Sequence, residues 1–177
     1  MKEKLVGVYW GRFNPPHKGH LEMIKSLSKK VKTVIVVIGS SEFKNEKRNP
    51  FSGAERKQML LAYIKEAKIK NVKVVTHKDK GGYFWSLSKL ITGYKPNVLF
   101  FPKNEKPELL RLAKEKFKNK VSVVTFKRTG SLSSTRLRNA IASNKKWEHL
   151  TGKSVIRLII KFNGTNRIKR TYKNSKK

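Results

Sequence analysis

The 177-residue sequence contains no cysteine, few acidic residues and no long hydrophobic run. Without cysteine, the chain can form neither a disulfide framework nor a thiolate metal site. The apolar run near the N-terminus is too short for the hydrophobic region of a signal peptide. No apolar stretch reaches the ~20 residues that a membrane-spanning helix needs. We therefore expect a soluble cytoplasmic protein that does not associate with membranes.

Acidic residues are scarce, since 11 Asp and Glu oppose 43 Lys and Arg and the formal net charge is +32. Such a chain attracts polyanions, including nucleotides and nucleic acids. A dedicated nucleic-acid binder concentrates its charge on one motif, whereas here the lysines are scattered along every expected helix. A lysine-rich proteome, or adaptation to heat or salt, is the simpler explanation. We therefore expect any binding of nucleic acid to be non-specific.

Short apolar runs alternate with amphipathic segments along the chain. The runs are rich in β-branched residues and apolar on both faces, as buried parallel strands are. They cover residues 5–10, 33–38, 73–76, 98–101 and 121–126. Helical patterns occupy residues 20–30, 54–65, 84–92 and 108–118, and two further helices are expected at about 135–143 and 154–162. This alternation predicts an α/β fold, a doubly wound parallel sheet of about five strands with closing C-terminal helices.

The length and continuity of the chain indicate one domain. Roughly 100–200 residues is the usual size of a domain, and the sequence shows no internal repeat or linker. We expect residues 1–177 to form a single domain, in which the polar, basic segment 166–177 is a frayed tail. In open parallel sheets, ligands bind beyond the carboxyl ends of the strands. Functional residues are therefore expected in the loops that follow the strands.

The first such loop reads GRFNPPHKGH, from Gly11 to His20, and runs directly into a helix. Gly11 and Gly19 allow close approach of the backbone, and the two prolines stiffen the turn. The helix that begins near Gly19 directs free N–H groups and the positive end of its dipole at the loop. His17 and His20 lie three residues apart around the helix start, so both imidazoles can converge on one anion. The loop therefore predicts a phosphate-binding site.

Two other interpretations of His17 and His20 stay open at this point. The histidines could be a metal pair, although two histidines alone do not complete a metal site. They could also be ordinary surface residues of a Pro-rich turn. We favour phosphate binding and expect no metal held by protein side chains.

A second candidate phosphate site begins a late helix. Ser133 is a suitable N-cap, and the hydroxyl groups of Ser134 and Thr135 can hold phosphate oxygens together with the free N–H groups. Arg138 can reach the β/γ end of a triphosphate. Many helices begin with such residues, so this pattern alone is weak. Paired with the first loop, it indicates one polyphosphate site built from two distant segments.

These segments resemble the nucleotidylyltransferase superfamily, which carries an HxGH motif on a Rossmann-like sheet. Within it, GRFNPPHKGHLEMIK is similar to the opening of archaeal-type nicotinamide-nucleotide adenylyltransferases, and Ser133–Arg138 matches the family pattern Ser-X-Thr-X-X-Arg. The resemblance covers nearly the whole chain. It implies transfer of AMP from ATP to nicotinamide mononucleotide (NMN), giving NAD and pyrophosphate. The resemblance also suggests a homo-oligomer. We expect Mg2+ to accompany ATP, held mainly by phosphate and water oxygens.

The resemblance also implies roles for individual residues. His17 and His20 would contact the ATP phosphates as catalytic residues, and Arg48 and Arg138 would clamp the polyphosphate. The implied ATP-binding residues are Gly11, Arg12, Phe13, Gly19, Ser133, Ser134 and Thr135. The implied residues for the accepting nucleotide are Gly39, Ser40, Asp79 and Trp85.

The sequence departs from the family pattern in two places. Residues 80–84 are one residue shorter than the family segment and lack its Asn. Pro102, Lys103 and Asn104 replace a Ser-Gly-Asn turn. Both departures fall in the pocket for the acceptor, so phosphopantetheine or a phosphorylated alcohol stays an alternative. A basic nucleic-acid-binding protein on this fold is a more distant one.

Overall fold

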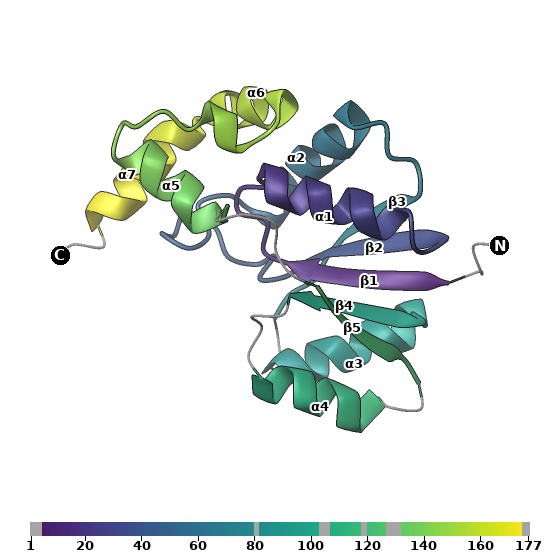
Figure 1. The fold of residues 1–177 in the computed structure, drawn as a ribbon. Coiled ribbons are helices and arrows are strands. Elements are labelled where there is room, and N and C mark those ends of the chain that lie inside the picture. Colours follow the sequence, from purple (N-terminus) through teal and green to yellow (C-terminus); the bar gives the residue numbers. More distant parts are fainter. Residues whose placement is uncertain (1–4, 80–81, 103–106, 118–119, 127–131, 175–177) are drawn as a thin grey trace.

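Five parallel strands form one sheet in the order β3-β2-β1-β4-β5, as Figure 1 shows. This computed structural model describes residues 5–79, 82–102, 107–117, 120–126 and 132–174, with backbone alone at 82–85, 107–110 and 112. The strands are β1 (Val6–Gly11), β2 (Thr33–Ile38), β3 (Val72–Thr76), β4 (Val98–Pro102) and β5 (Ser122–Phe126). Each lies within two residues of its predicted bounds. The parallel sheet confirms the predicted fold class.

Helices cover both faces of the sheet (Figure 1). One face carries α1 (Lys18–Ser28) and α2 (Gly53–Glu66), and the other carries α3 (Gly82–Tyr94) and α4 (Pro107–Phe117). Successive residues of a strand point to opposite faces. In β2, Val34 and Val36 therefore join the core beneath α1, whereas Ile35 and Val37 join the core beneath α3 and α4. This explains why the strand is apolar on both sides.

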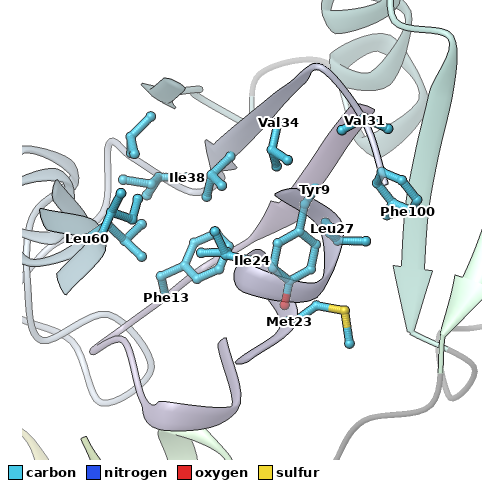
Figure 2. Close-up of a cluster of buried hydrophobic side chains, with 13 residues drawn as sticks. Tyr9, Phe13, Met23, Ile24, Leu27, Val31, Val34, Ile38, Leu60 and Phe100 are labelled. Atoms are coloured by element: carbon cyan, nitrogen blue, oxygen red, sulfur yellow. The ribbon is translucent and has the colours of Figure 1, made fainter. Parts of the chain in front are cut away.

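The loop after β1 is anchored in the core beneath α1. Figure 2 shows Phe13 among the side chains of Tyr9 and Ile24. Phe13 is 1% exposed, and its ring meets that of Tyr9 edge-on at 5.5 Å between centroids. Its φ of 50° is uncommon for a residue with a side chain. The buried ring therefore holds the beginning of the loop against the sheet.

The helix starts follow local capping rules. Glu55 N–H donates to Ser52 Oγ at 3.2 Å, and Ser52 N–H donates to Glu55 Oε2 at 2.8 Å. This reciprocal pair is the capping box that Ser-X-X-Glu predicts for α2. α1 begins at Lys18, two residues before the predicted start, with His17 as its N-cap. The histidine loop therefore reaches directly into the first turn of α1.

The C-terminal region forms a helical unit beside the sheet. It contains α5 (Ser134–Ala142), the short 3-10 helix η1 (Glu148–Leu150), α6 (Lys153–Lys161) and α7 (Gly164–Asn174). These helices share a buried cluster with Met59 and Tyr63 of α2. The prediction of a frayed tail over 166–177 was wrong as far as Asn174, because Ile168 (0% exposed) and Thr171 (7% exposed) are buried. Residues 175–177 lie outside the described part.

None of the helices in the described part of the chain is long and apolar enough to cross a bilayer.

Candidate active site

A cavity of about 860 Å³ opens at the carboxyl edge of the sheet, where the strand order reverses between β1 and β4. Segments that follow β1, β2 and β3 line it together with the start of α5. It thus lies where open parallel sheets bind ligands. The structure brings these predicted residues to its wall: Gly11, Arg12, Phe13, His17, His20, Ser40, Arg48, Asp79, Ser133, Ser134, Thr135 and Arg138.

His17 and His20 stack on each other at the mouth of α1. Their ring centroids lie 3.6 Å apart with 29° between the planes. His17 N–H donates to His20 Nδ1 at 3.2 Å. A neutral His20 therefore carries its proton on Nε2, which can donate to a phosphate oxygen. Gly19 does not line the cavity, but a Cβ there would lie 3.2 Å from the His17 ring, so this glycine makes room for the pair.

Side chains of the C-terminal unit hold successive carbonyl groups of the histidine loop. Arg138 Nη1 donates to Asn14 O at 2.7 Å, Ser134 Oγ to Pro15 O at 2.9 Å, and Thr151 Oγ to Pro16 O at 2.8 Å. Because these bonds join the two phosphate motifs directly, the second motif shapes the first loop as well as facing the cavity. The sequence had indicated only the second of these roles.

The start of α5 is capped as predicted. Ser133 Oγ accepts the N–H of Arg136 at 3.0 Å. Arg138, one turn further, is 6% exposed, and its Nη2 also donates to Thr135 Oγ1 at 3.2 Å. Desolvation lowers the pKa of Arg138, with Tyr172 raising it and the charge of Arg48 lowering it further. The guanidinium is thus held rigidly at the cavity wall.

Among the described residues, the guanidinium groups of Arg12, Arg48 and Arg138 line the cavity. Desolvation and the neighbouring charges of Arg48 and Arg138 lower the pKa of Arg12, whereas Asp79 raises it. Like charges at close range repel each other in a partly dehydrated site. A bound polyanion would relieve this repulsion and gain charge-assisted hydrogen bonds. The electrostatics of the cavity therefore suit a polyphosphate.

The far side of the cavity is built from the ends of β2 and β3. Ser40 Oγ donates to Asp79 Oδ2 at 2.5 Å, and Asp79 N–H donates to Glu42 Oε1 at 2.9 Å. Gly39 lies behind the wall, where a Cβ would collide with the indole nitrogen of Trp10. Trp10 itself lines the cavity. This side therefore offers an indole and a hydrogen-bonded carboxylate to a second ligand.

Part of the predicted acceptor pocket lies outside the described residues. The backbone of Trp85 belongs to α3, but its side chain is not described. Residues 80–81 and 103–104, where the sequence departs from the family, lie wholly outside the described part of the chain. Pro102 is described, ends β4 and lines the cavity. The role of Trp85 stays a prediction.

Sequence reasoning missed Asn14, whose side chain is 1% exposed. Its Oδ1 accepts Phe51 N–H at 3.1 Å, and its Nδ2 donates to Phe51 O at 3.0 Å. The amide thereby joins the histidine loop to the segment that precedes α2. An amide between an aromatic residue and two prolines was the signal, because such a residue needs polar partners if the loop is buried.

The cavity wall also includes Glu46 and Lys47 from the exposed loop between β2 and α2. Lys47 Nζ lies 5.1 Å from the centroid of the Tyr172 ring of α7, which is a cation–π contact. Within the described residues, no group of three or more His, Asp and Glu side chains could hold a metal ion. Lys47 adds to the positive charge of the arginines on the described wall, which suits phosphate oxygens.

Comparison with known proteins identifies the family. A family model described as Cytidylyltransferase-like matches residues 8–140. The nicotinamide-nucleotide adenylyltransferase of Methanococcus maripaludis is 32% identical over 162 residues, covering 90% of this chain and 91% of that protein. That of Thermococcus sibiricus is 30% identical over 166 residues, covering 92% of this chain and 87% of that protein.

A solved structure supports the fold. The bifunctional NMN adenylyltransferase/ADP ribose pyrophosphatase of Francisella tularensis, crystallised with AMP and a manganese ion, has a TM-score of 0.73 and 22% identity. The match covers 95% of this chain and 52% of that one, so this chain spans about half the length of the bifunctional protein. Because the family model and the archaeal relatives cover most of the sequence, the chain belongs to the cytidylyltransferase-like family, and its resemblance to archaeal nicotinamide-nucleotide adenylyltransferases is confirmed.

Proposed function

We propose that this protein is an adenylyltransferase that transfers AMP from ATP to NMN, forming NAD and pyrophosphate in NAD biosynthesis. The meeting of two phosphate motifs in one cavity carries this proposal. Ser134 and Arg138 donate to the carbonyl groups of Pro15 and Asn14, so two helix starts face the same space. The names of the archaeal relatives support NMN as the acceptor.

The proposed reaction is a displacement at the α-phosphorus of ATP. A phosphate oxygen of NMN forms the new bond to this phosphorus, and the bond to the oxygen bridging the α- and β-phosphorus atoms breaks. Pyrophosphate leaves with that electron pair. The attacking oxygen is already ionised at neutral pH, so no general base is required. Catalysis then consists of aligning two anions and stabilising the charge that develops.

The residues of the cavity suit these tasks. We assign His17 and His20 to the transferring phosphate, where Nε2 of His20 can donate. Arg12, Arg48 and Arg138 would hold the polyphosphate and neutralise the leaving pyrophosphate. The assignment of Arg138 is supported by its fixed position, because both of its Nη atoms donate to protein oxygens. Arg48 lies on the exposed loop and could follow the phosphates as they bind.

Divalent cation enters this reaction with the nucleotide. Mg2+ prefers phosphate and water oxygens to a protein cage, and the cavity wall carries only isolated carboxylates, Glu46 and Asp79, among its described residues. The Francisella structure contains AMP and a manganese ion. We therefore propose that the substrate is the Mg2+ complex of ATP. A cytoplasmic location and a homo-oligomeric state stay predictions.

The experiment that tests the function compares acceptors. Purified protein is incubated with ATP, Mg2+ and one acceptor at a time. The acceptors are NMN, nicotinate mononucleotide and phosphopantetheine. Chromatography then measures pyrophosphate and the adenylylated product. We expect NAD with NMN at the highest kcat/KM. Absence of product with every acceptor would refute the adenylyltransferase activity. Product with phosphopantetheine alone would refute only the choice of NMN as the acceptor.

A further inference from the structure

Arg56 is a charged residue that is completely buried next to the cavity without lining it. It lies in the first turn of α2 and is 0% exposed, the largest of the fully buried side chains in the described part of the chain. Arginine is almost never fully buried unless its charge is compensated. The proposed mechanism gives this residue no task. Its position therefore requires an explanation of its own.

Backbone carbonyl groups satisfy the guanidinium. Arg56 makes no ion pair within the described residues. Instead, Nη1 donates to Arg12 O and Gly39 O, each at 2.9 Å, Nη2 donates to Ser40 O at 2.8 Å, and Nε donates to Ser52 O at 3.2 Å. A planar guanidinium with a fixed fork of donors can serve several acceptors at once, which a lysine ammonium on a flexible stem cannot do in the same geometry.

Two of these carbonyl groups belong to residues on opposite sides of the cavity. Arg12 follows β1 on the side of the histidine loop, and Ser40 follows β2 on the side of Asp79. The same two loops are joined by Gly39 N–H, which donates to Gly11 O at 3.0 Å. Arg56 therefore lies behind the point where both substrate loops leave the sheet.

The Ser40 backbone needs this support more than the others. Its φ is 50°, in the left-handed region that costs energy for a residue with a side chain. The carbonyl oxygen of Ser40 itself accepts the hydrogen bond from Arg56 Nη2. In this conformation the Ser40 hydroxyl donates to Asp79. The orientation of the serine–aspartate pair thus depends on a backbone that Arg56 helps to fix, together with Phe43 N–H, which donates to the same carbonyl oxygen at 3.3 Å.

Arg56 stays charged beneath the cavity. Desolvation lowers its pKa to about 10, with Asp79 and Glu42 opposing this and Arg12 adding to it. At neutral pH the guanidinium is therefore cationic, and carbonyl dipoles replace the water that it lost. Removing the charged fork would take this donor from the carbonyl oxygens of Arg12 and Gly39. Ser40 O would keep the N–H of Phe43 at 3.3 Å, and Ser52 O would keep the backbone N–H of residue 56 at 3.0 Å.

We propose that Arg56 is a positioning residue that sets the geometry of both substrate loops through their backbone carbonyl groups, without contacting ATP or the acceptor. This inference rests on the proposed function for the identity of the two substrates. It predicts that a change at Arg56 impairs the use of both substrates together. Substitution of a residue that contacts one substrate would chiefly impair the use of that one.

The test compares Arg56→Lys, which keeps the charge, and Arg56→Met, which keeps much of the volume, with Ile159→Ala. Ile159 is 0% exposed in the core of the C-terminal unit, and its truncation controls for a general loss of stability. Kinetics are measured at a temperature where circular dichroism shows all variants folded. We expect kcat/KM for ATP and for NMN each to fall about 10- to 100-fold in both Arg56 variants. Ile159→Ala should stay within about twofold of wild type.

Hydrogen exchange gives a readout that does not depend on activity. Peptides covering residues 11–13 and 39–41 should exchange faster in Arg56→Lys, whereas peptides covering 155–160 should be unchanged. The positioning role would be refuted if Arg56→Met had the same kinetics as wild type. It would also be refuted if kcat/KM fell for one substrate alone. A third outcome is that the wild-type protein forms no NAD while the two loops still exchange faster in Arg56→Lys than in wild type. That result would refute the proposed function and leave the positioning role intact.

If neither Arg56 variant folds, nitrogen NMR of the wild-type guanidinium decides the question. A guanidinium held by several carbonyl groups shows separate, slowly exchanging Nη–H signals. We expect ATP alone and NMN alone each to shift them. Averaged signals, or signals that respond to neither ligand, would overturn the proposal.

Discussion

At the residue scale, the cations of the cavity divide into those the fold holds and those it leaves exposed. Arg138 is buried and bonded to Asn14 O, whereas Arg48 lies on an exposed loop. A buried guanidinium supports both structure and binding, because its loss leaves a carbonyl group without a donor. An exposed one supports binding alone. Substitution should therefore separate the two.

We expect Arg48→Ala to leave the melting temperature unchanged or slightly higher, because it removes repulsion with Arg12. The stabilisation that ATP adds should shrink, and KM for ATP should rise. Arg138→Met should lower the melting temperature without ligand and also lower kcat. Thermal unfolding with and without ATP, combined with steady-state kinetics, measures both. Equal losses of ligand-free stability in the two variants would contradict this division.

The histidine pair gives a second prediction. His20→Ala removes the Nε2 donor, and loss of one such donor typically costs about 10²–10³-fold in kcat. Lys18→Ala is the matched control, since Lys18 is exposed on the same helix turn and does not line the cavity. Single-turnover kinetics with ATP and NMN compare the two. Full activity in His20→Ala would show that this imidazole takes no part in transfer.

At the element scale, the C-terminal helix α7 is packed against the rest of the protein, contrary to the prediction from composition. Charge and polarity along residues 166–177 predict fraying, yet α7 packs Ile168 into the core of the C-terminal unit. Arg167 Nη1 also donates to both carboxylate oxygens of Glu55 in α2, at 2.9 and 2.8 Å. Tyr172 lies beneath Lys47 of the cavity wall. The last helix therefore supports the wall of the site.

Shortening a buried side chain of α7 tests whether this helix is folded in solution. Ile168→Ala should destabilise the protein by about 2–5 kcal/mol, as large-to-small changes in a core do. Lys169→Ala, at the adjacent exposed position, should change stability by less than about 0.5 kcal/mol. Urea unfolding monitored by circular dichroism measures both. If the two variants were equally stable, α7 would be frayed as the composition predicts.

A carboxylate at the end of α2 holds the start of α6. Ser154 N–H donates to Glu66 Oε2 at 2.7 Å. Burial alone would raise the pKa of Glu66, but the hydrogen bonds from Ser154 and Lys153 and the charge of Arg157 outweigh it, so the pKa is lowered. The ionised form therefore favours the folded state. Its contribution is fully present above the unfolded pKa of about 4.3.

This sign predicts a stability difference that depends on pH. Glu66→Gln should lower the melting temperature at neutral pH, and the difference from wild type should vanish as pH falls through the lowered pKa. Glu115→Gln is the control, because that carboxylate pairs with Arg111 on an exposed surface. Such a pair contributes little. Melting curves from pH 7 down to about pH 3 measure the effect, and a difference that grows in acid would have the wrong sign.

At the scale of the whole molecule, the net charge of +32 opposes compaction. Like charges spread over the surface repel, and salt screens them with a Debye length of about 10 Å at 0.1 M ionic strength. The same charge opposes assembly of several subunits at low salt. The predicted homo-oligomer would therefore be favoured by screening or by bound nucleotide.

We expect the melting temperature to rise as potassium chloride increases from about 0.05 to 0.5 M, because screening weakens the self-repulsion. Phosphate and sulfate are avoided, since they would also bind the cations of the cavity. Differential scanning fluorimetry measures the change, and sedimentation velocity at the same salt concentrations reports any assembly. A melting temperature that falls with salt would show that attractive ion pairs outweigh the repulsion.

Local sequence determined much of the scaffold. β2 has the predicted bounds, and Ser52 caps α2 as its spacing with Glu55 requires. Strand alternation and helix caps arise within a few residues of chain, so they can be read without knowing the fold. The histidine loop was found for the same reason. Its glycines, prolines and helix start are contiguous in the sequence.

Only the tertiary structure decided how the site is held together. Arg138 donates to the carbonyl group of Asn14, 124 residues away. Arg56 donates to those of Arg12, Gly39 and Ser40. Every residue carries a backbone carbonyl group, so an acceptor of this kind leaves no mark in a sequence. Which of them meets a buried guanidinium depends on how the strands and helices pack.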